Sequence, residues 1–270
     1  MAADGPPSTG FYLHPAAVLH DTGWGHPEHQ GRLRTLASTV GKDLIALVDH
    51  VEHVEPAPAS VEQLEMVHHP DQIARVLESV EEARKSGTVT SIDADTRVSG
   101  ASWEAALGTV GAGLAATTAV AEGQFRNAFV AARPPGHHAT PNQAMGFCLF
   151  NNIAIAARHL QRNHGAERIL IVDWDVHHGN GTQDAFYDDP SVCFLSIHQS
   201  PHYPGTGAAG EVGEGAGVGF TINVPIPAAM PRAQYRTLFE AELEGAVAKS
   251  NPDFILVSSG FDVLDGDPLG

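Results

Sequence analysis

Residues 169–182 read ILIVDWDVHHGNGT, an apolar run that ends in alternating carboxylates and imidazoles. The run is rich in β-branched residues and predicts a buried strand over residues 168–173. Alternation along an extended chain sends Asp173, Asp175 and His177 to one side, where the last two can bind one metal ion. Burial of such polar groups costs free energy unless they are paired or metal-bound, so the stretch predicts half of an active site.

Strands and helices alternate along the rest of the chain. Strands are predicted over residues 127–132, 192–198, 220–224 and 254–259, and helices over residues 102–123, 151–162 and 231–249. This order indicates an α/β fold whose mostly parallel sheet has helices on both faces, and in which ligands bind beyond the carboxyl ends of the strands. No repeat or linker divides the chain, so we expect a single domain over residues 1–270.

Composition excludes several classes of protein. The net charge of −17, from 15 basic and 32 acidic residues, disfavours direct nucleic-acid binding and suits a cationic ligand, although many cytosolic enzymes are equally acidic. We find no apolar run near the about 18 residues of a membrane span, and no signal peptide in residues 1–10, which predicts a cytoplasmic protein.

Cys148 and Cys193 lie in apolar sequence and predict buried free thiols. Trp24 and Trp103 are assigned to the core.

Three predicted strand ends supply carboxylates and imidazoles, and two of them supply candidate metal-binding side chains. Asp175 and His177 follow one strand and Asp262 follows another, so parallel pairing would bring all three to one edge. Two carboxylates and one imidazole suit Zn²⁺ with a fourth position open, and Fe²⁺ is an alternative. Each residue alone is explained as well by a helix-capping aspartate or a hydrogen-bonded histidine. Their occurrence together at strand ends favours a metal site.

A tandem histidine pair follows the third of these strands. His137 and His138 stand after Pro-Pro-Gly, where neither helical nor strand amphipathicity explains them. An imidazole can take a proton from water and return it to a leaving amine near neutral pH. Asp173 and Asn180 are the predicted partners that orient the two rings. The alternative is a solvated surface pair, and a lone pair such as His68-His69 more often has no function.

Several sequence blocks resemble the signature motifs of the zinc-dependent histone deacetylase family. In chain order they are RPPGHHA (133–139), MGFCLFNN (145–152), DWDVHHGNGTQDAF (173–186), PGTG (204–207) and SSGFD (258–262). They most resemble the class II-like bacterial branch, which includes acetylpolyamine amidohydrolases and acetoin-utilisation proteins. The resemblance implies an arginase-like fold with a central parallel sheet of about eight strands. It also implies a zinc-dependent hydrolase that removes acetyl groups from acetyl-lysine peptides or proteins, or from related amines.

The resemblance assigns roles to the residues already singled out. His138, facing Asn180, becomes the general base and acid, and His137 becomes its neighbour hydrogen-bonded to Asp173. Asparagine at position 180, where class I members have aspartate, indicates the class II branch. The zinc ligands implied are Asp175, His177 and Asp262.

The resemblance also implies substrate and ion contacts. Phe147 and Tyr203 correspond to the aromatic walls of a narrow acyl-lysine tunnel, although ordinary core packing would also explain Phe147. Asp93 corresponds to a rim aspartate that grips the substrate backbone, although a turn-forming aspartate is a simpler explanation. Ser196 corresponds to part of a structural potassium site.

The family further supplies a tyrosine, or a histidine in some branches, from a glycine-rich loop that stabilises the oxyanion. The sequence ends at Gly270 before such a loop, so we expect the C-terminal part of the domain to be missing and the activity to belong to the complete protein. The open alternatives are an acetylpolyamine amidohydrolase, and a non-catalytic acyl-lysine-binding module if the protein ends at Gly270. An arginase is disfavoured, because a two-manganese site needs further aspartates beside residues 173–178. A homo-oligomer is compatible with the sequence.

Overall fold

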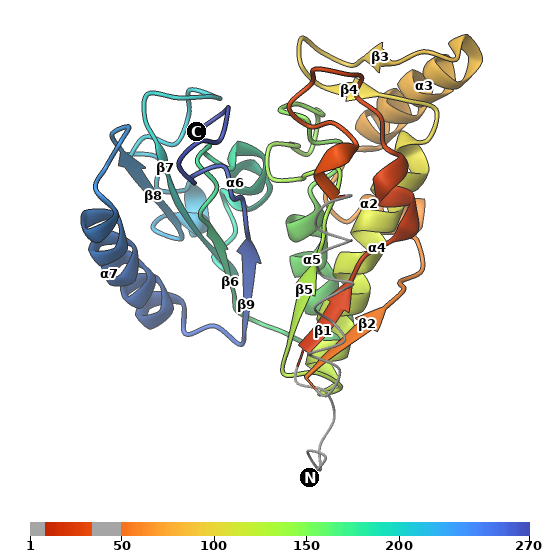
Figure 1. The fold of residues 1–270 in the computed structure, drawn as a ribbon. Helices are drawn as coiled ribbons and strands as arrows, with labels where there is room; N and C mark the ends of the chain where they lie inside the picture. The colour runs from red at the N-terminus through yellow and green to blue at the C-terminus, as the bar shows by residue number, and fades with distance from the viewer. Residues whose placement is uncertain (1–8, 34–49) are drawn as a thin grey trace.

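The computed structural model describes residues 9–33 and 50–270 (Figure 1). Residues 1–8, in which we sought a signal peptide, lie outside the described residues. The strands are β1 (Thr9–Tyr12), β2 (Val51–Val54), β3 (Thr90–Ser91), β4 (Arg97–Val98), β5 (Asn127–Val130), β6 (Ile169–Asp173), β7 (Val192–Gln199), β8 (Thr221–Ile226) and β9 (Phe254–Ser258). The helices are η1 (Pro15–Leu19), α2 (Val61–Leu64), α3 (Pro70–Ser86), α4 (Ser102–Ala121), α5 (Asn152–His164), α6 (Asn180–Phe186), η2 (Gly215–Gly217) and α7 (Arg232–Ser250), of which η1 and η2 are 3₁₀ helices.

The parallel strands fall into two sheets. One has the order β2-β1-β5 and the other the order β8-β7-β6-β9, and all their pairings are parallel, whereas β3 and β4 form a small antiparallel pair. The predicted parallel α/β arrangement is confirmed. We expected a single sheet of about eight strands, but in the described residues β5 and β9 are edge strands of separate sheets.

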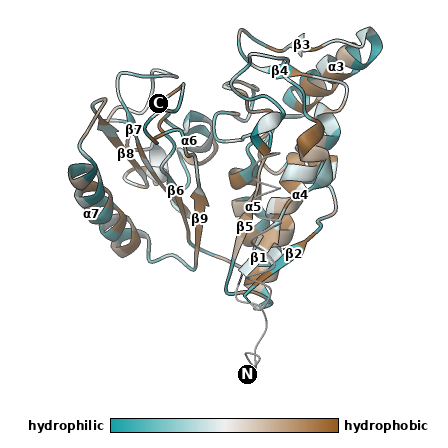
Figure 2. Ribbon diagram, viewed as in Figure 1, coloured by the Kyte–Doolittle hydropathy of each residue, from teal (hydrophilic) through white to brown (hydrophobic). Residues whose placement is uncertain are grey.

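β6 shows why the sequence ILIVD (169–173) forms a strand. All five of its residues are buried. Ile169 and Ile171 pack with residues of α5 and α6, whereas Leu170 and Val172 pack with residues of α7. Figure 2 shows the apolar strands of this sheet between the helices. A parallel strand covered on both faces needs apolar side chains at every position, which explains the continuous run instead of an alternating one.

α4 corrects our expectation about membrane spans. In the described residues it is long and apolar enough to cross a membrane, by length and composition alone. However, 61% of its most apolar window is buried inside the protein. The helix packs against α5, η1 and β5, and its alanines contact Tyr12 and Phe125 beside the three-stranded sheet. The small residues that let α4 approach its neighbours also give it the composition of a membrane span.

Of the tryptophans and cysteines that were predicted to be buried, all but Trp24 pack inside the protein. Trp103 packs edge-on against Phe150, with ring centroids 5.9 Å apart. Trp24, in contrast, is 99% exposed, so its assignment to the core was wrong. It lies in a turn between two glycines of positive φ, and this turn projects the ring from the surface. Both thiols, Cys148 and Cys193, are free and buried, as predicted.

The strand ends that carry the candidate site meet at one end of the molecule. β6 and β9 run parallel in a register that pairs Asp173 with Ser258, so the segments after both strands emerge side by side (Figure 1). The loop after β5 carries the tandem histidines, and His137 there reaches Asp173. The predicted convergence of three strand ends is therefore confirmed.

A buried ion pair ties the loop after β5 to the N-terminal region. Arg133 and Glu28 are 2% and 1% exposed, and Arg133 Nε lies 2.8 Å from Glu28 Oε1. The guanidinium also donates to the carbonyls of Ala17 (3.0 Å) and Glu28 (2.8 Å). Because Arg133 begins the RPPGHHA stretch, this pair anchors the backbone that leads to the tandem histidines.

We predict that Arg133→Met lowers the free energy of unfolding by about 3 kcal/mol, because it leaves the Glu28 carboxylate buried with a half-exposed Arg32 as its remaining cation. Urea denaturation followed by circular dichroism measures the effect. Arg236→Met, which breaks the exposed pair with Glu240, is the matched control and should change stability by less than about 0.5 kcal/mol. Equal stabilities of the two variants would contradict the anchoring role.

Candidate active site

The backbone bends directly after β6 because each aspartate there caps the next residues. Asp173 Oδ1 accepts a hydrogen bond from the amide of Asp175 (3.1 Å), and Asp175 Oδ1 accepts one from the amide of His177 (2.8 Å). We expected extended alternation to continue to His177, but the strand ends at Asp173. These two caps, rather than strand periodicity, bring the Asp175 and His177 side chains together.

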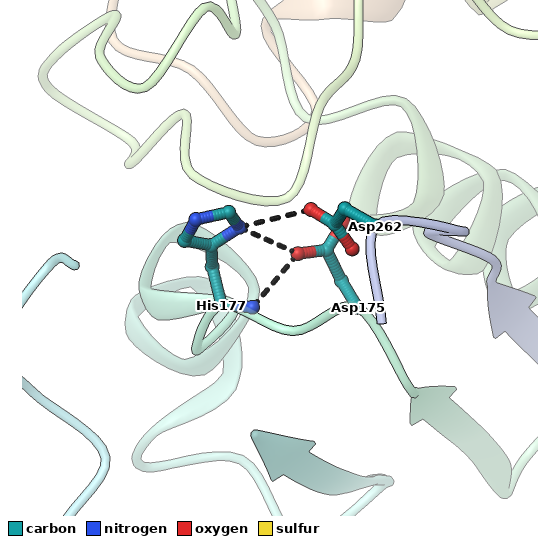
Figure 3. Close-up of side chains that lie close together, drawn as sticks. All are labelled: Asp175, His177 and Asp262. Atoms are coloured by element: carbon teal, nitrogen blue, oxygen red, sulfur yellow. Dashed lines mark hydrogen bonds and ion pairs between the residues drawn. The ribbon is translucent and has the colours of Figure 1, made fainter. Parts of the chain in front are cut away.

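Asp175, His177 and Asp262 converge on one point (Figure 3). His177 Nδ1 lies 2.9 Å from Asp175 Oδ1 and 3.0 Å from Asp262 Oδ2, and the three ligand atoms lie within 4.8 Å of one another. Asp262 Oδ1 accepts from the amide of Val176 (3.0 Å), which fixes its carboxylate toward the site. The three residues, predicted from two strand ends, thus form one cluster.

The negative charges of this cluster favour a bound cation. Burial alone would lower the pKa of His177, but hydrogen bonds to Asp175 and Asp262 raise it to about 9. Burial would raise the pKa of Asp175, but the charge of His137 and the hydrogen bonds from His177 hold it well below its usual value. Two carboxylates around one imidazole nitrogen give the mixed oxygen and nitrogen donor set of a three-ligand metal site with an open position. The residues therefore fit a bound metal ion.

The tandem histidines have different partners. His137 Nδ1 donates to Asp173 Oδ2 (2.9 Å); burial opposes its charge, but Asp173 and Asp175 raise the pKa of His137 to about 9. His138 Nδ1 lies 2.8 Å from Asn180 Oδ1. Burial and the charge of His137 lower the pKa of His138 well below the ordinary value. The predicted pairings, His137 with Asp173 and His138 with Asn180, are both present.

His138 also lies beside the candidate metal cluster. Its ring centroid is 3.9 Å from that of His137 and 5.8 Å from that of His177. Tyr203 packs edge-on to His138 with centroids 5.0 Å apart, and it is 36% exposed. Burial and the nearby charges of Asp95 and Asp93 raise the pKa of Tyr203. An uncharged imidazole, a cation site and a half-exposed aromatic ring therefore share one small region.

Phe147 approaches the same region from another loop. Gly146 and Phe147 both have positive φ (56° and 67°). A Cβ at position 146 would lie 2.4 Å from Cδ2 of His138, so this position requires glycine. The amide of Phe147 donates to Thr96 Oγ1 (3.1 Å), and its ring packs edge-on to His26 with centroids 4.7 Å apart. Tyr203 thus packs on His138, and Phe147 directly follows the glycine that lies against His138. The role of both rings as tunnel walls stays a prediction.

Two further predicted site residues have structural partners of their own. Asp93 Oδ1 accepts from the amides of Asp95 (3.0 Å) and Thr96 (2.6 Å), which favours the turn-forming interpretation that we kept open. Ser196 is fully buried beside Asp173 in the sheet, and its hydroxyl lies 2.9 Å from His198 Nδ1. Substrate binding by Asp93 and potassium binding by Ser196 stay predictions.

Sequence reasoning missed several polar residues that surround the site. His178 Nδ1 lies 2.8 Å from Thr206 Oγ1, and its Nε2 lies 3.1 Å from Gln183 Oε1. His202 stacks on His177, with centroids 4.7 Å apart and an interplanar angle of 15°. Their presence inside the DWDVHHGNGTQDAF block or next to Tyr203 was the available signal. Sequence alone does not reveal which groups they contact.

Comparison with known proteins agrees with this geometry. The family model described as "Histone deacetylase domain" matches residues 26–270. The chain is 43% identical over 217 residues to "Histone deacetylase 14, chloroplastic" of Arabidopsis thaliana, covering 78% of this chain and 51% of that protein. It is 38% identical over 261 residues to a "Probable deacetylase" of Archaeoglobus fulgidus, covering 97% and 71%. The crystal structure of the HDA15 HD domain superposes with a TM-score of 0.90 at 35% identity, over 98% of this chain and 76% of that one.

The superposition confirms the predicted arginase-like deacetylase fold, even though the strands here are divided between two sheets. The chain spans about half the length of the Arabidopsis relative that it matches.

We predict that Asp262→Asn raises the dissociation constant for Zn²⁺ by more than about 100-fold, because it removes one anionic ligand. Loss of a group that only hydrogen-bonds to a metal ligand costs about 10–100-fold, and loss of a ligand itself should cost more. Competition with a chromophoric chelator on metal-stripped protein measures the dissociation constant. Asp265→Asn, an exposed carboxylate on the same segment, is the matched control and should bind as the unaltered protein does. Unchanged affinity in Asp262→Asn would remove Asp262 from the ligand set.

Proposed function

Because this chain belongs to the histone deacetylase family, we propose that it hydrolyses the amide of N-acetyl-lysine side chains at a zinc ion held by Asp175, His177 and Asp262. The observation that carries the proposal is the position of His138. Its ring lies 5.8 Å from the imidazole of the candidate metal cluster, and its hydrogen bond goes to an uncharged amide. A base beside a metal site is the arrangement that metal-assisted amide hydrolysis needs.

Zinc is the proposed metal because the donor set contains one imidazole and two carboxylates. Three protein ligands with an open fourth position are typical of catalytic zinc sites. When bound, the ion supplies a Lewis acid that polarises the acetyl carbonyl and lowers the pKa of water in its open position. Fe²⁺ accepts the same donors and is the alternative metal.

The role proposed for His138 is to move the protons. Asn180 Nδ2 donates to the carbonyl of His138 (3.4 Å) and lies 3.5 Å from Met145 Sδ, so the amide oxygen faces the ring. His138 Nδ1 therefore donates to Asn180 Oδ1, and the lone pair of Nε2 is free to accept a proton from water. Its lowered pKa keeps the ring uncharged at neutral pH, and the protonated ring then delivers the proton to the leaving amine.

His137 is proposed to act as a fixed charge. The pKa of about 9 keeps its ring protonated at neutral pH. Asp173 orients this ring through Nδ1, and the opposite nitrogen lies 3.9 Å from Asp175 Oδ2. A positive charge held here favours negative charge that develops on the substrate oxygen during attack. It also disfavours protonation of His138 before substrate binds.

The acetyl-lysine side chain suits the aromatic residues at the site. Tyr203 and Phe147 offer ring surface for the alkyl part of the acetyl-lysine side chain. The net negative charge of the protein suits a cationic product amine. Acetylated polyamines have the same acyl-amine chemistry and are the alternative substrate class. To separate the two substrate classes, kcat/KM is measured for an acetyl-lysine peptide and for an acetylated diamine with the same protein preparation. The preferred class will have the higher kcat/KM.

We predict that His138→Ala lowers kcat of deacetylation by at least about 10²-fold with little change in KM, because it removes the proton acceptor and donor. A fluorogenic acetyl-lysine peptide measures the rate, with a chelator-treated sample as the metal-free reference. His53→Ala, an exposed histidine on β2, is the matched control and should retain full activity. Turnover by His138→Ala near the unaltered rate would refute the role of His138.

We predict that Asn180→Asp moves the acidic limb of the kcat/KM profile to higher pH. A carboxylate at the 2.8 Å position of the amide oxygen stabilises the protonated imidazole and so raises the pKa of His138. Since the base works unprotonated, activity of the variant should already fall at a pH where the unaltered protein is fully active. A profile that coincides with that of the unaltered protein would show that His138 is not the group that titrates.

A further inference from the structure

His202 stands apart from the residues given a role so far. It lies in the loop after β7, directly before Tyr203, and is half-buried. It belongs neither to the candidate ligand set nor to the tandem pair. Its ring nevertheless lies parallel to the ring of His177, with centroids 4.7 Å apart and planes 15° apart.

This contact differs from the others that His177 makes with aromatic rings in the described residues. His138 and Tyr203 meet the His177 ring edge-on, at interplanar angles of 73° and 79° and centroid distances of 5.8 and 6.1 Å. His202 is the ring that covers a face. A ring held on one face restricts rotation about χ2 of His177, which is the torsion that aims Nδ1 at the two carboxylates.

His202 makes a second contact, with the segment that follows β9. Its Nε2 lies 2.9 Å from the carbonyl oxygen of Leu269, and because a carbonyl accepts, Nε2 carries the proton. Leu269 belongs to the segment after β9 that also carries Asp262. Within that segment the amide of Leu269 donates to Asp267 Oδ1 (2.9 Å), and the amide of Asp267 donates to the carbonyl of Leu264 (3.1 Å). One side chain therefore touches both strand-end segments that supply the ligands.

We propose that His202 is a positioning residue for the metal site, which holds the His177 ring in its ligating orientation and holds the Asp262 segment against it. The inference deepens the proposed function, since it rests on the same Asp175–His177–Asp262 site. It also explains why an imidazole suits this position. The role needs a flat aromatic face and an N–H donor on one short side chain, and phenylalanine or glutamine supplies only one of the two.

Three substitutions separate the two contacts. His202→Phe keeps a ring that can stack but removes the donor to Leu269. His202→Gln keeps an N–H donor but removes the aromatic face, and His202→Ala removes both. His29→Ala, an exposed histidine in the N-terminal region, is the matched control.

The measurement is binding of Co²⁺ to metal-stripped protein, by chelator competition and by the visible absorption of the bound ion, which reports the geometry of its ligands. We expect His202→Ala to bind Co²⁺ about 10-fold more weakly or worse, in line with loss of a group that orients a ligand, and to shift the absorption band. His202→Phe and His202→Gln should each recover part of the affinity, and His29→Ala should match the unaltered protein.

The proposal is overturned if His202→Ala binds Co²⁺ with unaltered affinity and an unaltered band. If His202→Ala does not fold, the Phe and Gln variants decide, and unaltered binding in both overturns it. Since the readout is metal binding, it does not depend on turnover. A protein whose Co²⁺ affinity depends on His202 as described, but which fails to hydrolyse acetyl-lysine, would refute the proposed function and leave this inference standing.

Discussion

The candidate site depends on two carboxylates that share one imidazole nitrogen. Asp175 and Asp262 both lie within 3.0 Å of His177 Nδ1 on side chains that are largely shielded from water. Two such acids repel each other unless a positive charge lies between them, so this arrangement is stable only with a proton or a metal ion. The parallel pairing of β6 with β9 imposes it, because the segments that follow the two strands have to emerge side by side.

The same environment gives two adjacent histidines opposite properties. His137 faces Asp173 and has a raised pKa, whereas burial and the charge of His137 lower the pKa of His138, which faces an uncharged amide. Their ring centroids are 3.9 Å apart, so protonation of one disfavours protonation of the other. The difference follows from the partners and not from the histidines themselves. Under the proposed function, this difference provides one fixed charge and one proton acceptor within a single tandem pair.

Most of the four-stranded sheet and the residues of the candidate metal cluster could be predicted because their signals are local. β6 is covered on both faces and is therefore apolar at every position, and polar residues directly after such a strand indicate a site at its end. α3 was missed although Pro70 opens it and Gly87 ends it in the left-handed conformation, both of which are readable helix signals. The division into two sheets and the contact of His202 with Leu269 depend on distant segments, so no local pattern predicts them.

The turn at Asp93 shows that a residue assigned by a motif can also have a structural role in its own loop. The resemblance suggested that its carboxylate grips the substrate, but Oδ1 accepts from the amides of Asp95 and Thr96. Thr96 in turn accepts from the amide of Phe147 through its hydroxyl. Asp93 therefore shapes the loop whose Thr96 hydroxyl holds the backbone of Phe147, whether or not Asp93 touches substrate. The hydrogen bonds of the turn establish this shaping role, and substrate contact by the Asp93 carboxylate stays a prediction beside it.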